Sequence, residues 1–331
     1  MDETMGSTGM NERLSVIICS KDRRRDLERA IESVRRSGPM AASAELVVVE
    51  EGDRSEPLSG VQYVHLPRHH RGFGYARNVA IKAATGSLLL FLDDDCEAAV
   101  GWAEALVTPF QQSSDILGVA GAVAVKHCGL VGYAEHILGF PGGGLRYVHE
   151  AQGRVVPTAY LSTCNCAYRR TALEQIGGFP EEAKAGSEDA LVAERLSHLG
   201  TCLYNPQAVV YHRTRDRLGA VLCWFVRRGF SEMASLSHRR DRRSYRWYLL
   251  RSSWTIRVTL LTVLVVGVPP LLMLAPFGMV LYYAAMLLRF RFARLYPTHR
   301  SAWWLVPLVK LTMDTGHELG RWKFILAGGR T

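Results

Sequence analysis

The chain has 331 residues, and 48% of them are hydrophobic. This is enough for one large domain or two, and it excludes a protein that is too small or too polar to bury a hydrophobic core. Its net charge is +9, and the excess of positive charge is concentrated between His212 and Arg257, a segment that contains twelve arginines and three acidic residues. Such a segment indicates an anionic surface, either phospholipid or nucleic acid. Because a long apolar segment follows directly, we expect anionic membrane lipid as the partner and no nucleic acid.

The cysteine pattern indicates reduced thiols. The chain has seven cysteines, an odd number without a repeated CxxC pair. Cys164 and Cys166 have a CxC spacing with no second half, which favours small-residue packing over a redox or zinc pair. The catalytic part is therefore expected in the cytosol. The first ten residues are polar and contain no apolar segment, so no signal peptide is expected.

Short apolar runs and one helical pattern alternate along the first part of the chain. They predict strands over Leu14–Cys19, Leu46–Val49, Val61–Leu66 and Ser87–Leu92, and helices over 27–34 and Tyr75–Ala84. Strand, helix and strand within about forty residues form a βαβ unit, which implies a right-handed crossover and a parallel strand pair. We therefore expect an α/β fold with a mostly parallel sheet flanked by helices.

Three consecutive acids, Asp93, Asp94 and Asp95, follow the strand Ser87–Leu92. Adjacent carboxylates repel one another and are costly to bury unpaired, so a core strand that ends in this way suggests a bound cation. Oxygen ligands suit Mg²⁺ or Mn²⁺, and open α/β sheets bind ligands beyond the carboxyl ends of their strands. The alternative is a solvated acidic turn, and the spacing of the acids alone does not decide between the two.

The segment GFGYAR at 72–77 contains a G-x-G before a helix, a pattern that can indicate dinucleotide binding. Arg77 stands where the third glycine of that motif would be, and a basic loop precedes the segment in place of a first strand. A Rossmann site is therefore not expected. An arginine at a helix start beside the carboxyl edge of a sheet suits a phosphate or a nucleotide.

Five segments of the chain resemble, in order, the motifs of family 2 glycosyltransferases with the GT-A fold. They are SVIICSKDR, VVVEEGD, GYARNVAIKAATGSLLLFLDDD, NCAYRRTALEQIGGFPEE and SEDALVAERLSHLG. The resemblance covers Leu14 to Arg215. It implies an inverting transferase that uses a nucleoside diphosphate sugar and a divalent metal, Mn²⁺ or Mg²⁺. It also implies a catalytic domain over 14–215, after a disordered N-terminus over 1–13 and before a basic helical region over 216–331.

The resemblance assigns the acid triplet to the metal and the donor. It implies that Asp95 ligates the metal directly, and that Asp93 and Asp94 hold the metal, its waters or the ribose. In many relatives a histidine after a late strand completes the metal shell, and here His212 has that place, with a purely structural histidine as the alternative.

Donor binding is assigned to residues after the first two strands and to Arg77. The acid that pairs with the nucleotide base in the family corresponds to Glu51, where an aspartate is usual, so the base stays open between uridine and guanosine. Backbone groups of Cys19 and Ser20 would line the same base.

The acceptor side is assigned to two segments later in the chain. Asp189 resembles the family's general base, which removes the proton of the acceptor hydroxyl, and Glu188 resembles its orienting or acceptor-binding neighbour. On local sequence alone, these acids could serve only the helix dipole. Gly178 and Phe179 resemble the acceptor-side loop. Since no Q-x-x-R-W signature of processive synthases follows, transfer of a single sugar is favoured over polymerisation.

Beyond Arg217 the sequence becomes basic and then apolar. Leu249–Val268 and Leu271–Leu288 could each cross or nearly cross a bilayer, which takes about 17 to 25 residues. Arginines flank both, so the positive-inside rule predicts a transmembrane or re-entrant hairpin over about 249–288, with both ends cytoplasmic. Tryptophans in the final apolar stretch suggest an interfacial helix. We therefore expect an enzyme at the cytoplasmic face of the inner (plasma) membrane.

Three classes of function remain open. The favoured one is a membrane-anchored transferase that moves one sugar to a lipid-linked or membrane-proximal glycan acceptor, with a polyprenyl-phosphate glycosyltransferase or a processive polysaccharide synthase as variants. A sugar nucleotidyltransferase would have a glycine-rich loop after the first strand, where this chain has SKDRRR. A catalytically silent membrane scaffold would not need the intact acids Asp93 to Asp95 and Glu188–Asp189.

Overall fold

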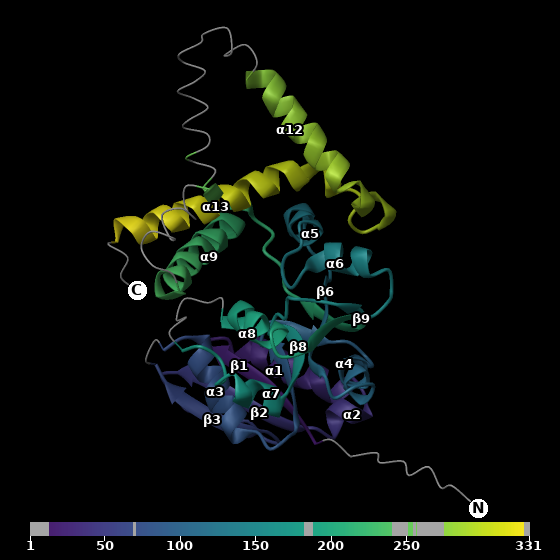
Figure 1. The fold of residues 1–331 in the computed structure, drawn as a ribbon, viewed down its shortest axis with the longest axis vertical. Helices are drawn as coiled ribbons and strands as arrows, with labels where there is room; N and C mark the ends of the chain where they lie inside the picture. The colour runs from purple at the N-terminus through teal and green to yellow at the C-terminus, as the bar shows by residue number, and fades with distance from the viewer. Residues whose placement is uncertain are drawn as a thin grey trace, which may run out of the picture.

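The structure is a computed structural model, and it describes residues 13–68, 71–181, 188–239, 251–253, 256 and 275–327. The N-terminal two thirds of the chain form one α/β unit (Figure 1). Its strands are β1 (Leu14–Lys21), β2 (Glu45–Gly52), β3 (Gln62–Pro67), β4 (Leu88–Asp93), β5 (Cys96–Ala98), β6 (Ile116–Val125), β7 (Val156–Pro157), β8 (Asn165–Arg169) and β9 (Thr201–His212). Its helices are α1 (Arg24–Arg36), α2 (Pro39–Ala42), α3 (Phe73–Ala83), α4 (Trp102–Val107), the 3₁₀ helix η1 (Thr108–Gln111), α5 (Leu130–Ile137), α6 (Gly144–Ala151), α7 (Arg170–Gln175) and α8 (Glu188–Ser197).

All nine of these strands belong to one sheet, in the order β3-β2-β1-β4-β8-β6-β9-β5, with β7 beside β9. The half formed by β3, β2, β1 and β4 is parallel throughout, which confirms the predicted βαβ unit. The other half contains both orientations, because β8 runs antiparallel to β4 and β6 while β9 runs parallel to β6. The four predicted early strands and both predicted helices are present, with bounds that differ from the predicted ones by at most three residues.

Alternation along the central strands builds a hydrophobic core on each face of the sheet. Val16 and Ile18 of β1 point to one face, where they pack with Leu27 of α1. Ile17 points to the other face and packs with Ala80 of α3. Strands covered on both faces are continuous apolar runs, and this is why the run that ends at the acid triplet forms a central strand. The carboxyl ends of β1, β2 and β4 then meet at one edge of the sheet.

The C-terminal region is helical and packs beside this unit (Figure 1). It contains α9 (Leu218–Arg239), α12 (Ala275–Arg289), the 3₁₀ helices η3 (Arg291–Leu295) and η4 (Trp303–Leu305), and α13 (Val306–Leu326). Helix α13 lies against α9 at very short range. A Cβ atom on Gly229 would be 2.0 Å from the His317 carbonyl oxygen, and one on Gly320 would be 2.0 Å from that of Val226. The close crossing therefore depends on these two glycines and holds α9 against α13.

The predicted hairpin over 249–288 is tested only in part. Most of Leu249–Val268 lies outside the described residues, and the second segment corresponds to α12, which has 15 residues. Within the described ranges, no helix combines the length and the apolar character needed to cross a bilayer. The predicted transmembrane hairpin therefore has no support from the structure. Helix α12 does expose apolar side chains, among them Phe277, Val280 and Leu288.

Candidate active site

The carboxyl ends of β1 and β4 bring the first candidate residues together. In the parallel register, Cys19 of β1 pairs with Asp93 of β4. Ser20 Oγ donates a 2.7 Å hydrogen bond to Asp94 Oδ2, and both side chains are buried. Arg23 lies over the solvent side of the cluster, with its guanidinium 3.3 Å from Asp94 Oδ1. Ser20 therefore orients a member of the acid triplet and does not face the solvent.

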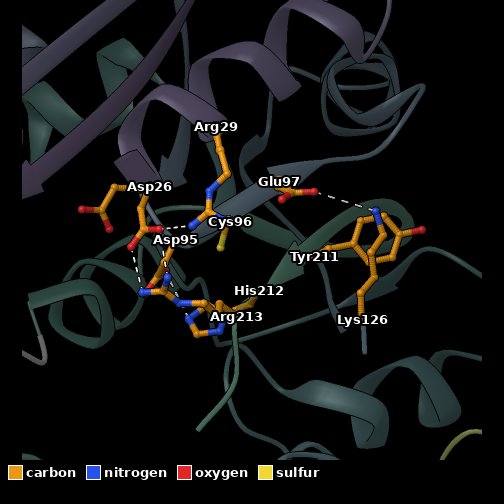
Figure 2. A pocket seen from close by; sticks show the side chains of 10 residues that line it. Asp26, Arg29, Asp95, Cys96, Glu97, Lys126, Tyr211, His212 and Arg213 are labelled. Carbon is orange, nitrogen blue, oxygen red and sulfur yellow. Dashed lines mark hydrogen bonds and ion pairs between the residues drawn. The ribbon is translucent and has the colours of Figure 1, made fainter. Parts of the chain in front are cut away.

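Strand pairing places Asp95 beside His212. The antiparallel register of β5 and β9 aligns Cys96 with His212, and the Arg213 backbone N–H donates a 3.1 Å hydrogen bond to the Asp95 carbonyl oxygen. His212 Nε2 then lies 3.3 Å from Asp95 Oδ1 (Figure 2). The other oxygen of this carboxylate, Oδ2, lies 2.8 Å from the guanidinium of Arg23. The structure thus brings together Asp95, the predicted direct metal ligand, and His212, which was predicted to complete the metal shell.

The donor atoms at this point fit a divalent metal. Ligand atoms of Asp95, Cys96 and His212 all lie within 4.8 Å of one another. Burial lowers the pKa of His212. The carboxylate of Asp95 raises this pKa, while the positive charges of Arg215 and Arg23 lower it further. The imidazole is therefore neutral near pH 7 and can bind a metal. Burial raises the pKa of the Cys96 thiol well above its usual value, which leaves a protonated sulfur and a poor ligand. A carboxylate oxygen and a neutral imidazole nitrogen suit Mn²⁺, so Asp95 and His212 are the residues here that would hold such an ion.

Asp93 faces Arg77 and not His212. Arg77 lies 3.7 Å from Asp93 Oδ1, and it also forms a buried ion pair with Glu188 at the start of α8. Burial raises the pKa of Asp93 to about 7, and the carboxylates of Asp95 and Asp94 contribute to this increase. The positive charge of Arg77 acts in the opposite direction. Asp93 was predicted to be a metal ligand as well, but it lies outside the Asp95–Cys96–His212 group. Arg77, predicted to bind a phosphate, is already paired with two carboxylates.

Asp189 follows Glu188 and is suited to accept a proton. Its Oδ1 accepts a 2.8 Å hydrogen bond from the Ala190 backbone N–H. Burial and the charge of Glu188 raise the pKa of Asp189 to about 6, while Arg77 and Arg228 act in the opposite direction. The carboxylate is therefore mostly ionised at pH 7, yet it is more basic than an exposed aspartate.

One cavity of about 650 Å³ connects these groups, a size that is typical of ligand sites. Its lining includes the acid triplet, His212, Arg77 and Cys19, together with Asp189, Glu188 and Tyr160. Burial raises the pKa of the Cys19 thiol to about 12, so this side chain contributes a neutral surface. The Asp95–His212 pair and Asp189 thus line one common cavity.

A second, smaller cavity of about 290 Å³ lies beyond the ends of β1 and β2 and contains Glu51. Lys21 Nζ donates a 2.6 Å hydrogen bond to Glu51 Oε1. Arg68 crosses the cavity and bonds Asp22 at 2.7 Å and Asp53 at 2.9 Å. Glu51 therefore has the predicted place at the strand end, within a network of paired charges. Lys21 was not singled out in the sequence, and Arg68 was noted only as part of the basic loop that precedes GFGYAR.

The structure does not place Gly178 or Phe179 in the large cavity. The Phe179 side chain is 1% exposed and packs edge-on against Phe91 at 5.5 Å. Its backbone N–H donates to Asn78 Oδ1 and its carbonyl oxygen accepts from Asn78 Nδ2, both at 2.8 Å. Gly178 has φ +76°, and a Cβ there would be 2.6 Å from Asn78 Oδ1. The acceptor-binding role predicted for these residues does not fit, because the loop is held against α3 and its aromatic ring is in the core.

The sequence interpretation missed a wall of the cavity that comes from α9. Six residues of this helix line the cavity, namely Ala220, Cys223, Trp224, Arg227, Arg228 and Ser231. Their spacing of three, four, seven, eight and eleven residues is that of one helical face. That spacing was visible in the sequence, but the basic character of the segment was read only as a signal for membrane lipid. Arg213 and Arg215, also in the lining, are each paired, with Asp26 at 2.8 Å and with Glu135 at 2.8 Å.

Comparisons with known proteins show what the chain is similar to. Residues 15–177 match the family "Glycosyl transferase family 2". The chain is 26% identical over 230 residues to the pre-mycofactocin glycosyltransferase of Mycobacterium tuberculosis, covering 66% of this chain and 45% of that protein. It is 29% identical over 122 residues to the glucosyl-dolichyl phosphate glucuronosyltransferase of Haloferax volcanii, covering 34% of this chain and 38% of that protein. It thus spans less than half the length of these curated relatives.

A solved structure shares the fold over nearly the whole chain. It is the mannosyltransferase PcManGT from Pyrobaculum calidifontis, in complex with GDP-Man and Mn²⁺. The TM-score is 0.57 at 16% identity, covering 92% of this chain and 87% of that structure. The fold is therefore GT-A-like, as the motif order implied. Residues 15–177 match the glycosyl transferase family 2 model, and the chain has the fold of a solved mannosyltransferase.

Proposed function

We propose that the protein is an inverting glycosyltransferase that moves one sugar from a nucleoside diphosphate sugar to an acceptor hydroxyl. The observation that carries the proposal is the single cavity shared by the Asp95–His212 pair and by Asp189. A donor diphosphate needs a positive charge beside it, which a metal at Asp95 and His212 would supply. An acceptor hydroxyl needs a proton acceptor, which Asp189 would supply. The match of residues 15–177 to family 2 supports this division.

The donor would extend along the carboxyl edge of the sheet. We assign the nucleotide to the side of Cys19, Glu51 and the acid triplet, with UDP or GDP as its carrier. The solved structure of PcManGT, which shares the fold, is a complex with GDP-Man and Mn²⁺, and this supports a nucleotide sugar and a divalent ion as ligands. Asp95 and His212 would hold Mn²⁺ or Mg²⁺, an ion that offsets the charge of a diphosphate leaving group when bound. Arg23, 2.8 Å from Asp95, supplies further positive charge at the same point.

The transfer step requires Asp189. Its carboxylate takes the proton of the acceptor hydroxyl while that oxygen forms a bond to the anomeric carbon, and the bond from this carbon to the diphosphate oxygen breaks. A single displacement of this kind inverts the configuration at the anomeric carbon. Glu188 forms a buried ion pair with Arg77, so we assign it a positioning role for Asp189.

The acceptor is proposed to be lipid-linked or membrane-proximal. The relative from Haloferax volcanii is named for a dolichyl phosphate substrate, which supports a lipid carrier. Helix α12 exposes Phe277, Val280 and Leu281 at 60%, 63% and 53%, an apolar surface suited to a lipid interface. We accordingly propose that the protein acts at the cytoplasmic face of the inner membrane. Anionic lipid would contact the basic C-terminal region.

A panel of nucleotide sugars tests the function. The full chain is mixed with UDP- and GDP-sugars, with and without Mn²⁺, and thermal stability is followed. One donor should raise the melting temperature in a metal-dependent manner, and Asp95→Asn should lose this shift. Without an acceptor, the enzyme should slowly hydrolyse that donor. The released sugar should have the inverted configuration at its anomeric carbon. Absence of a metal-dependent shift with every donor would contradict the proposal.

A further inference from the structure

One wall of the cavity is formed by a single helix and has an unusual composition. Helix α9 presents Trp224, Arg227 and Arg228 there, on the face opposite to the one that packs on α13. The packed face includes Val221 and Phe225, which are buried with Met313 of α13. The close glycine crossing of α9 and α13 holds this wall in place.

Two arginines of this wall differ from the other arginines in the cavity. Arg23, Arg77, Arg213 and Arg215 each form an ion pair with a carboxylate. In the part of the chain that the structure describes, Arg227 and Arg228 form no ion pair, although both line the cavity. Guanidinium groups that line a cavity without a paired carboxylate attract an anion.

Aromatic rings flank one of the two cations. The guanidinium carbon of Arg228 lies 5.2 Å from the ring centre of Phe140 and 5.3 Å from that of Trp224. Arg215 contacts the same Trp224 ring, at 4.3 Å. The rings limit the positions that the Arg228 head group can take and leave its N–H donors for a ligand. They also give the wall an apolar surface directly beside the charge.

The α9 wall lies near Asp189, and this indicates which substrate it would contact. Arg228 is close enough to affect the ionisation of both Asp189 and Tyr160. The donor diphosphate is already assigned to the acid triplet and His212 of the same cavity, where a bound metal would offset its charge. An anion held by α9 would therefore belong to the molecule whose hydroxyl meets Asp189, and that molecule is the acceptor.

We propose that Arg227 and Arg228 form a phosphate subsite for the acceptor, with Trp224 and Phe140 against the group next to that phosphate. Two guanidinium groups offer paired N–H donors and two positive charges, which match the oxygens and the charge of a phosphate monoester. The substrate class is then an acceptor that carries a phosphate beside an apolar group or a sugar. The assignment rests on the function proposed above and specifies its acceptor.

Geranyl phosphate and geraniol are suitable probes, because they differ only in the phosphate. Binding to the full chain is measured with Mn²⁺ and the nucleoside diphosphate that the donor panel identifies, both at saturation. Geranyl phosphate should bind at least tenfold more tightly than geraniol. Arg227→Gln and Arg228→Gln should each weaken its binding about tenfold, and Arg228→Lys should weaken it less. Arg217→Gln is the matched control, an exposed arginine outside the cavity, and should bind as the wild type does.

Three results would overturn the subsite. Equal binding of the two probes, or equal binding by the wild type and both glutamine variants, would remove the phosphate role. Exclusion of geranyl phosphate by the metal nucleotide would assign the arginines to the donor. Loss of binding to phosphatidylglycerol vesicles in the two variants, without any binding of soluble geranyl phosphate, would assign them to the lipid surface. The proposed function fails in a different way, through loss of metal-dependent nucleotide binding, which none of the arginine variants should affect.

Discussion

Arg77 of α3 and Glu188 of α8 form an ion pair whose side chains are only 7% and 5% exposed. The pair joins two helices that lie far apart in the sequence, and Asp189 is the residue next to it. We expect Glu188→Ala to reduce the free energy of unfolding by about 3 kcal/mol, because a buried arginine would lose its main partner. Denaturant unfolding measures this. Glu32→Ala removes an exposed pair with Arg36 and should cost under about 1 kcal/mol. Equal losses for the two variants would contradict the structural role of the buried pair.

The crossing of α9 and α13 predicts a sharp difference between two glycines of α9. Gly229→Ala places a methyl group 2.0 Å from the His317 carbonyl oxygen, so the helices must separate, at a cost of about 1–3 kcal/mol. Gly219→Ala meets nothing within 4 Å and should be neutral or stabilising, by up to about 1 kcal/mol. Thermal unfolding of both variants tests the packing. If Gly229→Ala is as stable as Gly219→Ala, the two helices do not cross at this distance.

The acid side of the pH–rate profile should report Asp189. Its pKa is raised to about 6 by burial and by Glu188, against Arg77 and Arg228, and only the ionised form accepts a proton. Activity should therefore be constant above pH 7 and fall about tenfold per pH unit well below 6. Removal of a nearby positive charge in Arg228→Gln should move the midpoint upward. Survival of the same profile in the residual activity of Asp189→Asn would assign the titration to another group.

Much of the fold followed from patterns that the sequence displays directly. Buried parallel strands are apolar on both faces, so β1, β2 and β4 were recognisable, and the acids after β4 marked the edge where ligands bind. The Asp95–His212 contact depends on the register of β5 with β9, which no local pattern encodes. It could be anticipated only from the order of the motifs.

The acceptor side was less predictable, for a physical reason. Whether Phe179 faces a ligand or the core depends on how its loop is held, and the deciding contacts come from Asn78, about a hundred residues earlier. Arg227 and Arg228 are indistinguishable in the sequence from the other arginines of the basic segment. Only the direction of α9 shows that these two line the cavity.

Membrane attachment can be tested on α12. Val280→Asp places a charge among exposed apolar side chains and should weaken binding of the full chain to phosphatidylglycerol vesicles about tenfold. Val100→Asp provides the control, because Val100 is 86% exposed and lies before α4, in another part of the chain. Vesicle flotation separates bound from free protein. Equal flotation of the two variants would show that α12 is not the contact surface.

The central claim is that Asp95 serves the donor and Asp189 the acceptor within one cavity. It is tested most directly by measuring nucleotide affinity and turnover together for Asp95→Asn and Asp189→Asn. Asp189→Asn keeps the shape of the side chain but not the proton acceptor, so turnover should fall about 10²-fold or more while metal-dependent nucleotide binding stays unchanged. Asp95→Asn should lose both, and excess chelator should have the same effect on the wild type. If Asp189→Asn weakens nucleotide binding as much as Asp95→Asn does, Asp189 is a donor-side residue and the proposed mechanism has no base.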